Sequence, residues 1–507
     1  MNTNDANHNP SFTPQRKFYS LPPVLRPLPK DGATLSPKNR IFLSKRKKPF
    51  CNQFRIVVSF LLFFVLLSFV MTILFLWQVH LRSKGQAAAS PKKNLVEDPA
   101  SSCIPLPKPI PLAKLSERLN DKLQEMEKFI VKNMAVNKGF GALSANLVYR
   151  DKIIWRGTFG VMNKSEITPR KPSTASVYPC ASISKVITAL IAYKLLDENM
   201  ITSLDEPVTK YDPDFKIKNP FNNHNITLRN LLSMTSGIQR EAPCFTTKKN
   251  NFCPFDHNTM LKRIQNLSLL VEPNTILQYS NFGYALLGNV LAKRFTSGDF
   301  GALAKKYVLE PLGMDSTKFS INLSQLKHVP VAYVEDGKPA KVYDWGWLNP
   351  GGGMFTTVDD LAKMVKELLT DRNQGRYLSK YTTRELLSVV MQIRSDQWLT
   401  LLRSVRNYAG LSFIIFCFCL FTASVMPDGK TMAGTPWEME LVDGIVYREK
   451  GGSVFGYEGR VVMVPELRIA LNVLCTNCFG FISNLISTSF VKQIVPSLEQ
   501  ELRKHQD

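Results

Sequence analysis

An uncharged run, IVVSFLLFFVLLSFVMTILFLW at residues 56–77, constrains this chain more than any other feature. At about 1.5 Å per residue, a helix of that length spans the hydrocarbon core of a bilayer. A cleavable signal peptide is the alternative, but the run is long for one and begins far into the chain. We therefore predict a single transmembrane helix over residues 55–79.

Basic residues are concentrated before this helix. The cluster KRKK at residues 45–48 leads into the run, whereas the segment that follows has a weaker basic excess and soon carries Glu97 and Asp98. Cytoplasmic flanks of membrane helices are the basic ones, so the N-terminus is expected in the cytosol. This predicts a type II membrane protein whose remaining chain faces the lumen or the outside. The formal net charge of +23 then points to a membrane rather than to nucleic acid.

The segments on either side of the helix have different compositions. Residues 1–54 contain many prolines, few aliphatic residues and scattered basic ones, which predicts a disordered, basic cytosolic tail. Residues 80–111 are dense in proline and should form an extended, fairly stiff linker. We assign residues 112–507 to the folded domain.

Hydropathy periodicity outlines the fold of that domain. Residues 112–134 repeat apolar side chains at helical spacing, and residues 143–160 give two short strands about a polar turn. The middle, about 182–369, is mostly helical, residues 448–477 return to strands, and a last helix covers 482–495. We expect an α/β (α+β) fold in which both ends contribute to one antiparallel sheet, flanked by helices and carrying an inserted all-helical lobe. The cleft between sheet and lobe is the expected site.

The stretch CASISKVITAL places Ser182 and Lys185 three residues apart at the start of an apolar helical pattern. Residues at this spacing share a helix face, so the amine can reach the hydroxyl. A serine at a helix N-terminus also has its N–H where an oxyanion would form. The same S-x-x-K spacing occurs four more times in the chain. The pair alone is therefore equally consistent with a helix cap beside a surface lysine.

Two further segments carry polar residues beside predicted elements. LQYSNFGYALLG contains Tyr279 and Asn281 just before a helix, and REKGGSVFG contains Lys450 at the end of a strand. Taken singly, Tyr279 is a loop aromatic, Asn281 a helix cap and Lys450 a solvated strand residue. Each is unremarkable without the others.

In this order, the motifs S-x-x-K, Y-x-N and K-x-G resemble the three signature elements of the serine β-lactamase and penicillin-binding-protein superfamily. The likeness is greatest to class C β-lactamases and to esterases of the same fold. LRNLLSMTSGI, LEPLGMDST and NPGGGMFTTVDDLAKM also fit that family, and the likeness covers about residues 113–500. It implies a β-lactamase/transpeptidase-like fold.

The resemblance implies a role for each motif residue. Ser182 would be the acylated nucleophile, with Lys185 and Tyr279 sharing the proton that leaves its hydroxyl. Which of the two is the base stays open. Asn281 would orient the substrate carbonyl or Lys185, and Lys450 would face the same cleft, where like charges depress an amine pKa.

The third motif would supply the strand that binds substrate. Backbone N–H groups of Ser182 and Ser453 would form the oxyanion hole, and Gly452 would let strand and substrate approach closely. Gly451 lacks a hydroxyl that often holds a substrate carboxylate in this family, so β-lactams are poor candidate substrates. The expected activity is acyl transfer from a small ester or amide to water, without a cofactor or metal. A catalytically inactive binding or scaffolding protein is the alternative.

Cysteines and glycosylation signals bear on the compartment. Cys244 and Cys253 bracket a polar stretch and could form a disulfide in a lumenal domain, although a pair of free thiols is equally consistent with the sequence. No histidine or cysteine spacing indicates a metal site. Four sequons are candidate N-glycosylation sites: Asn163, Asn225, Asn266 and Asn322.

A second uncharged stretch, residues 408–426, lies within a hydrophobic insertion at about 395–430. A second membrane crossing there would put Lys450 on the opposite side from Ser182. The alternatives are a buried or surface-docked insertion and a splice-derived segment that damages the fold. The intact strand pattern that follows favours these two over a crossing. Nothing in the sequence indicates an oligomeric state.

Overall fold

The computed structural model describes residues 105–112, 114–137, 139–221, 225–244, 251–334, 337–370, 377–392 and 431–506. All of them belong to one compact unit, Ser101–Asp507. The predicted tail, the transmembrane helix over 55–79, most of the 80–111 linker and the 408–426 stretch lie outside the described residues and stay predictions. Within the described ranges, no helix has both the length and the apolar character needed to cross a membrane.

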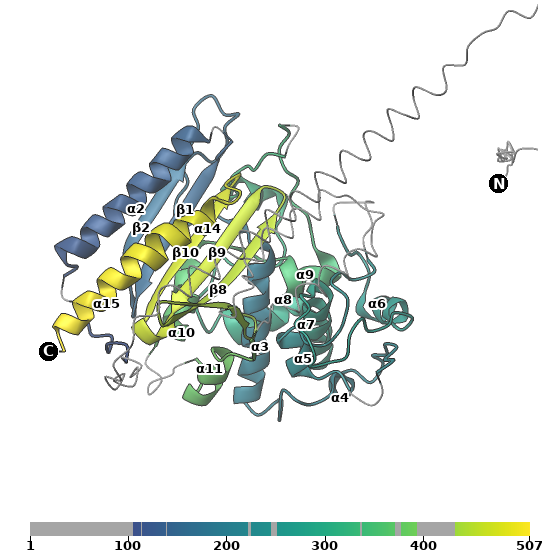
Figure 1. The fold of residues 1–507 in the computed structure, drawn as a ribbon. Coiled ribbons are helices and arrows are strands. Elements are labelled where there is room, and N and C mark those ends of the chain that lie inside the picture. The colour runs from purple at the N-terminus through teal and green to yellow at the C-terminus, as the bar shows by residue number, and fades with distance from the viewer. Residues whose placement is uncertain are drawn as a thin grey trace, which may run out of the picture. The chain divides into compact units, whose positions relative to one another are not determined.

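An eight-stranded antiparallel sheet forms the centre of this unit, in the order β2-β1-β10-β9-β8-β7-β6-β5 (Figure 1). Its strands are β1 (Ala142–Tyr149), β2 (Lys152–Gly160), β5 (Met391–Gln392), β6 (Thr431–Ala433), β7 (Glu438–Val442), β8 (Ile445–Val454), β9 (Tyr457–Val464) and β10 (Ile469–Thr476). Strand β1 pairs with β10, with Leu143 opposite Cys475. The prediction of one antiparallel sheet built from both ends of the domain is confirmed.

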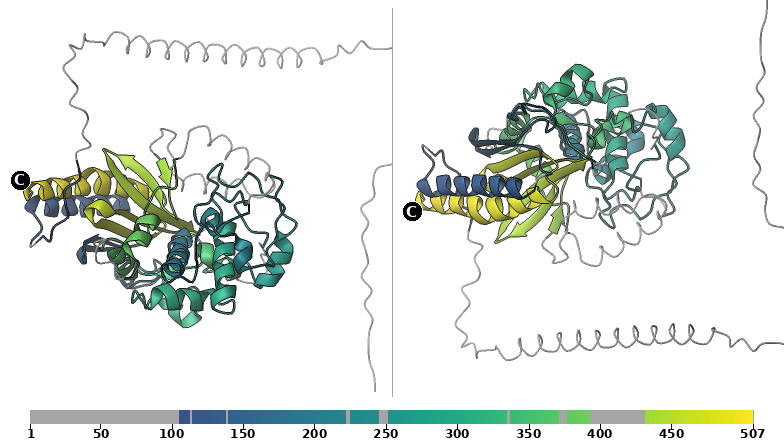
Figure 2. Two further views of the ribbon diagram at one scale, coloured as in Figure 1. Left: turned by 90° about the horizontal axis from the view of Figure 1, so that it is seen from below. Right: turned by 90° about the horizontal axis from the view of Figure 1, so that it is seen from above.

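Two long helical segments cover one face of the sheet. Helix α2 (Glu117–Val136) begins at Ser116, whose hydroxyl accepts from the N–H of Leu119. The C-terminal segment runs from α14 (Phe481–Leu485) through a π-helix (Ile486–Ile494) to α15 (Val495–Lys504), and so extends beyond the predicted 482–495. Figures 1 and 2 show α2 beside α15 on this face.

The other face carries the helical lobe, as predicted. Its elements are α3 (Ser184–Asp197), α4 (Val208–Tyr211), α5 (Leu228–Leu232), α6 (His257–Ile264), α7 (Asn281–Phe295), α8 (Phe300–Ala304), α9 (Asn349–Gly352), α10 (Val358–Leu368) and α11 (Lys380–Leu386), with a two-stranded sheet of β3 (Tyr178–Pro179) and β4 (Phe355–Thr356). Helix α3 is apolar on all sides and almost wholly buried, which is typical of a central helix. Its N-terminus therefore brings Ser182 and Lys185 to the junction of sheet and lobe.

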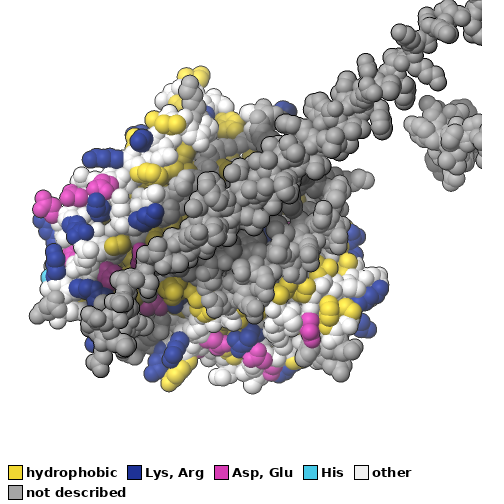
Figure 3. Space-filling model, in the orientation of Figure 1, with side chains coloured by type: hydrophobic (Ala, Val, Ile, Leu, Met, Phe, Trp, Pro, Cys, Tyr) yellow, Lys and Arg dark blue, Asp and Glu magenta, His cyan; other side chains and the backbone are white. Residues whose placement is uncertain are grey.

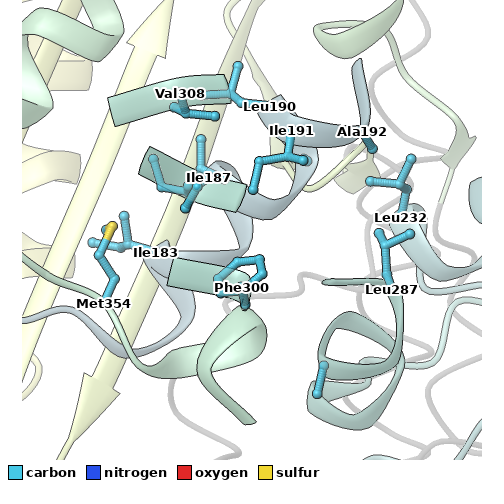
Figure 4. Close-up of a cluster of buried hydrophobic side chains, with 14 of the residues drawn as sticks. Ile183, Ile187, Leu190, Ile191, Ala192, Leu232, Leu287, Phe300, Val308 and Met354 are labelled. Carbon is cyan, nitrogen blue, oxygen red and sulfur yellow. The ribbon is translucent and has the colours of Figure 1, made fainter. Parts of the chain in front are cut away.

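Side chains of α3 form part of a continuous apolar core. Figure 4 shows Ile187 and Leu190 among side chains from other segments, including Phe300 and Val308. All four have less than a tenth of their surface exposed. On the face shown in Figure 3, the described Lys and Arg side chains are interspersed with Asp and Glu.

The disulfide considered between Cys244 and Cys253 is not formed. Both are buried, unbonded thiols. Hydrogen bonding to Cys253 and burial raise the pKa of the Cys244 thiol. Because thiols are oxidised through the thiolate, this environment slows oxidation of Cys244. The structure instead has a disulfide that the sequence analysis did not anticipate, between Cys475 on β10 and Cys478 just after that strand.

Truncation of Ile187 should test how far the site depends on the α3 core. Ile187 is fully buried, so Ile187→Ala should lower the free energy of unfolding by about 2–5 kcal/mol, and Ile187→Val by about 0.5–1.5 kcal/mol. Denaturant unfolding followed by circular dichroism measures both. Equal, small losses for the two variants would contradict tight packing around α3.

Candidate active site

Ser182 lies in a sharp turn that precedes α3. It is the middle residue of a short 3-10 helix, Ala181–Ile183, in which Ala181 adopts a positive φ of 44°. The Ser184 hydroxyl donates to the Ala181 carbonyl at 2.5 Å and accepts from the N–H of Met354 at 2.9 Å. These bonds hold the turn so that Ser182 is partly accessible at the end of a buried helix.

Lys185 has no exposed surface, and its amine makes three hydrogen bonds. The Nζ donates to Ser182 Oγ at 3.0 Å, to Asn281 Oδ1 at 2.7 Å and to the Gly351 carbonyl at 2.5 Å. The predicted contact across one helical turn is thus present. Burial lowers the pKa of Lys185, and the nearby Lys450 ammonium lowers it further, although Tyr279 opposes them.

Tyr279 also reaches the serine. Its hydroxyl donates to Ser182 Oγ at 2.5 Å. The amines of Lys185 and Lys450 lie 4.9 Å and 5.3 Å from the centroid of its ring, and the Arg240 guanidinium lies 4.7 Å from it. Burial by itself would raise the pKa of Tyr279, but the two lysine ammonium groups outweigh it and hold that pKa below its ordinary value.

Asn281 is the first residue of α7 and not its cap. The preceding Ser280 caps the helix by accepting from the N–H of Gly283 at 2.8 Å. The Asn281 side chain therefore does not cap the helix and instead faces the site. Its Oδ1 accepts from Lys185, and its Nδ2 donates to Glu241 Oε1 at 2.9 Å. Glu241 thereby fixes which end of the amide faces the lysine.

Lys450 is buried and paired. Only 1% of it is exposed, and its Nζ lies 2.5 Å from Glu438 Oε1 on β7. Burial would lower the pKa of Lys450, but the Glu438 carboxylate, with Tyr279, raises it above its ordinary value. The alternative that Lys450 is a solvated strand residue is therefore wrong. Its amine is buried and held as an ammonium.

Gly452 brings β8 against the nucleophile turn. A Cβ at this position would lie 2.1 Å from the Cys180 carbonyl oxygen and 2.8 Å from the Ser182 nitrogen, so only glycine fits. The close approach places the next residue, Ser453, beside the turn. The N–H groups of Ser182 and Ser453 are thus carried by adjoining segments, as an oxyanion hole requires.

Three contributors to the site were missed by the sequence analysis: Glu241, Glu438 and the carbonyl of Gly351. Gly351 lies in the one-turn helix α9, where a Cβ on it would lie 2.9 Å from the Asn281 carbonyl oxygen. Thr357 caps the following helix, α10, by accepting from the N–H of Asp360.

The arrangement can accept the serine proton in two ways. A neutral Lys185 can donate to Asn281 and Gly351 and turn its lone pair to the Ser182 hydroxyl. Alternatively, a charged Lys185 donates to Ser182 Oγ while an ionised Tyr279 accepts the hydroxyl proton. The groups interact closely, so they titrate as a unit. In the part of the chain that the structure describes, no group of three or more His, Cys, Asp or Glu could hold a metal ion.

Fold and site together define a serine hydrolase architecture of the β-lactamase and penicillin-binding-protein type. The chain belongs to the β-lactamase family, whose model matches residues 124–416. It is 29% identical over 409 residues to beta-lactamase-like 1 of Homo sapiens, covering 79% of this chain and 74% of that protein.

Solved structures show the same fold. An octameric penicillin-binding protein homologue from Pyrococcus abyssi has a TM-score of 0.56 and 22% identity, with 73% of this chain and 79% of that one covered. A class C β-lactamase has a TM-score of 0.57 and 17% identity, with 76% of this chain and 98% of that one covered. The fold expected from the sequence is therefore confirmed.

Tyr279 should ionise at a lower pH than a free tyrosine, because two lysine ammonium groups flank it. Buried tyrosines elsewhere, such as Tyr178 and Tyr447, have pKa values raised by burial and should ionise later. Near-ultraviolet difference absorbance during a pH titration should show an early tyrosinate step that Tyr279→Phe removes. Identical titration curves for the two proteins would contradict the electrostatics described above.

Proposed function

We propose that this protein is a membrane-anchored serine hydrolase that transfers the acyl group of a small ester or amide to water. The observation that carries the proposal is the convergence of two ionisable groups on one hydroxyl, either of which can take its proton once deprotonated. Lys185 Nζ at 3.0 Å and the Tyr279 hydroxyl at 2.5 Å both contact Ser182 Oγ. A purely structural serine needs neither, and burying an amine and a phenol beside it is costly.

The proposed reaction has two halves. Ser182 Oγ attacks the substrate carbonyl carbon, and its proton passes to the base formed by Lys185 and Tyr279. The bond to the leaving group breaks as that proton is delivered to it, which leaves an acyl-enzyme. Water then attacks the acyl carbon, gives a proton to the same base, and releases the acid as the Ser182 hydroxyl is restored.

An inactive binding protein of the same fold is the second candidate. Gly451 favours it, because the third motif lacks its usual hydroxyl. The structure gives a further reason why a side chain is disfavoured there, since a Cβ on Gly451 would lie 3.0 Å from Arg460 Nε. Retention of Ser182, Lys185 and Tyr279 in hydrogen-bonding geometry supports the hydrolase.

Replacing the nucleophile separates the two candidates. Ser182→Ala should reduce kcat/KM for p-nitrophenyl acetate by about 1000-fold or more. It should also abolish labelling by a fluorophosphonate probe. Equal labelling of both proteins would reject Ser182 as the nucleophile, and labelling of neither would favour the binding protein. Circular dichroism of both proteins controls for folding.

We also propose that residues 55–79 anchor the chain in a membrane with the hydrolase domain lumenal or extracellular. The uncharged run and the basic residues before it support this orientation. Three candidate glycosylation sites, Asn225, Asn266 and Asn322, are exposed. Asn163 is half-buried, and its Oδ1 accepts from the Tyr333 hydroxyl at 2.8 Å.

Glycosylation of full-length protein made in eukaryotic cells tests this topology. A lumenal domain should show a gel shift on endoglycosidase treatment, reduced by one step in each of Asn225→Gln, Asn266→Gln and Asn322→Gln. Asn163→Gln should leave the shift unchanged, because Asn163 is half-buried whereas the other three asparagines are exposed. The absence of any shift in the wild-type protein would contradict the orientation.

A further inference from the structure

Residues 239–241 are hydrogen-bonded to residues 280–282, the segment that follows Tyr279. Each of the three positions makes one bond across: the Ser280 hydroxyl donates to the Gln239 carbonyl at 2.7 Å, the Phe282 N–H to the Arg240 carbonyl at 3.1 Å, and the Asn281 Nδ2 to Glu241 Oε1 at 2.9 Å. The backbone of residues 239–241 is therefore held beside the segment that carries two of the motif residues.

Arg240 lies against the ring of Tyr279. Its guanidinium carbon is 4.7 Å from the ring centroid, within the range of a cation–π contact. The hydroxyl of the same ring donates to Ser182 Oγ at 2.5 Å. Because an arginine does not lose its proton in proteins, a permanent positive charge lies one ring away from the nucleophile.

Glu241 is connected to the other proton-sharing group. Its Oε1 accepts from Asn281 Nδ2 at 2.9 Å, and Asn281 Oδ1 accepts from Lys185 Nζ at 2.7 Å. The carboxylate is therefore two hydrogen bonds away from the buried amine. The same Oε1 lies 3.2 Å from Arg240 Nε, and each of these two charged side chains is 37% exposed.

The two charges act on the shared proton in opposite directions. Burial raises the pKa of Tyr279, but the ammonium groups of Lys185 and Lys450 lower it. The Arg240 guanidinium adds to this lowering. Burial lowers the pKa of Lys185, and Glu241 opposes this by favouring the ammonium form. Arg240 thus favours loss of a proton from the pair, whereas Glu241 favours its retention.

Other titratable groups face the same pair. They come from α7, β7 and β8, and they are Tyr284, Glu438 and Lys450. Glu438 and Lys450 form an ion pair with each other, and burial raises the pKa of Tyr284 well above its ordinary value. Substitutions at positions 240 and 241 leave these three side chains in place, so the effects of the two charges can be measured separately.

We propose that Arg240 and Glu241 are positioning residues that set, in opposite directions, the pH at which the base of the site can take the serine proton. Arg240 acts through the ring of Tyr279, and Glu241 acts through the amide of Asn281. The inference rests on the proposed hydrolase function for its kinetic consequence. A merely structural role would lower activity in both variants without moving their pH profiles apart.

Profiles of kcat/KM against pH for p-nitrophenyl acetate test this in the full-length chain. The base must lose a proton before it can act, so activity falls on the acid side of the profile. Arg240→Gln removes a nearby positive charge and should move this acid limb to higher pH by about 0.5–1 unit. Glu241→Gln removes the negative charge, keeps an oxygen that can accept from Asn281, and should move the limb to lower pH by about as much.

Conservative and matched variants separate charge from packing. Arg240→Lys keeps a cation beside the ring and should restore most of the wild-type acid limb. Combining Arg240→Gln with Glu241→Gln should place the limb between those of the single variants. Arg294→Gln removes a guanidinium from beside the ring of Phe295 at the far end of α7, and should leave the profile unchanged.

A shift in the same direction for Arg240→Gln and Glu241→Gln, or no shift for one of them, would overturn the assignment. Hydrolysis that Ser182→Ala still abolishes would in that case sustain the enzyme and reject only the role of these two residues.

Ionisation of Tyr279 gives a measurement that needs no hydrolysis. Near-ultraviolet difference absorbance, taken against the same protein carrying Tyr279→Phe, should show the tyrosinate step at higher pH in Arg240→Gln than in the wild type. Arg240→Lys should return the step to near its wild-type pH. An unchanged step in Arg240→Gln would reject the assignment of Arg240 whether or not the chain hydrolyses esters. A shifted step in a chain without hydrolysis would reject the enzyme and sustain the action of Arg240 on Tyr279.

Discussion

The complete burial of Lys185 is the constraint on which the site depends. Removing an ammonium from water costs several kcal/mol unless a partner compensates, and its hydrogen-bond partners in the described structure are neutral oxygens. These come from the nucleophile turn, from Asn281 at the start of α7, and from Gly351 in α9. Three distant segments must therefore meet at one nitrogen, which constrains how the start of α3 packs against α7 and α9.

The two buried lysines differ in their partners, and so in their protonation. Lys450 has a carboxylate, Glu438, that raises its pKa, whereas Lys185 has none at hydrogen-bonding distance in the described part of the chain and its pKa is lowered by burial. When two similar groups have their pKa values shifted in opposite directions, one keeps a fixed charge and the other can exchange protons. Lys450 is suited to hold Tyr279 in an ionisable state, and Lys185 to share the proton of Ser182.

The spacing of residues in the sequence predicts some contacts of this site, but not those that depend on strand register or on the choice between two neighbouring caps. The Ser182 and Lys185 contact follows from helical spacing, and the pairing of β1 with β10 from strand patterns at both ends of the domain. Glu438 could not be found in this way, because its contact with Lys450 depends on the register that sets Glu438 opposite Glu449. Capping of α7 was also assigned to the wrong neighbour, since serine and asparagine are both good caps. Only the structure shows that Ser280 caps the helix and frees Asn281.

Gly452 holds strand β8 against the nucleophile turn. The contact of β8 with the nucleophile turn requires a residue without a side chain, and that contact also fixes where the strand continues. Because Ser453 follows Gly452 on β8, the same contact sets the Ser453 backbone beside that of Ser182. A side chain at position 452 would push the strand away from the turn and separate the two N–H groups that the proposed oxyanion hole needs.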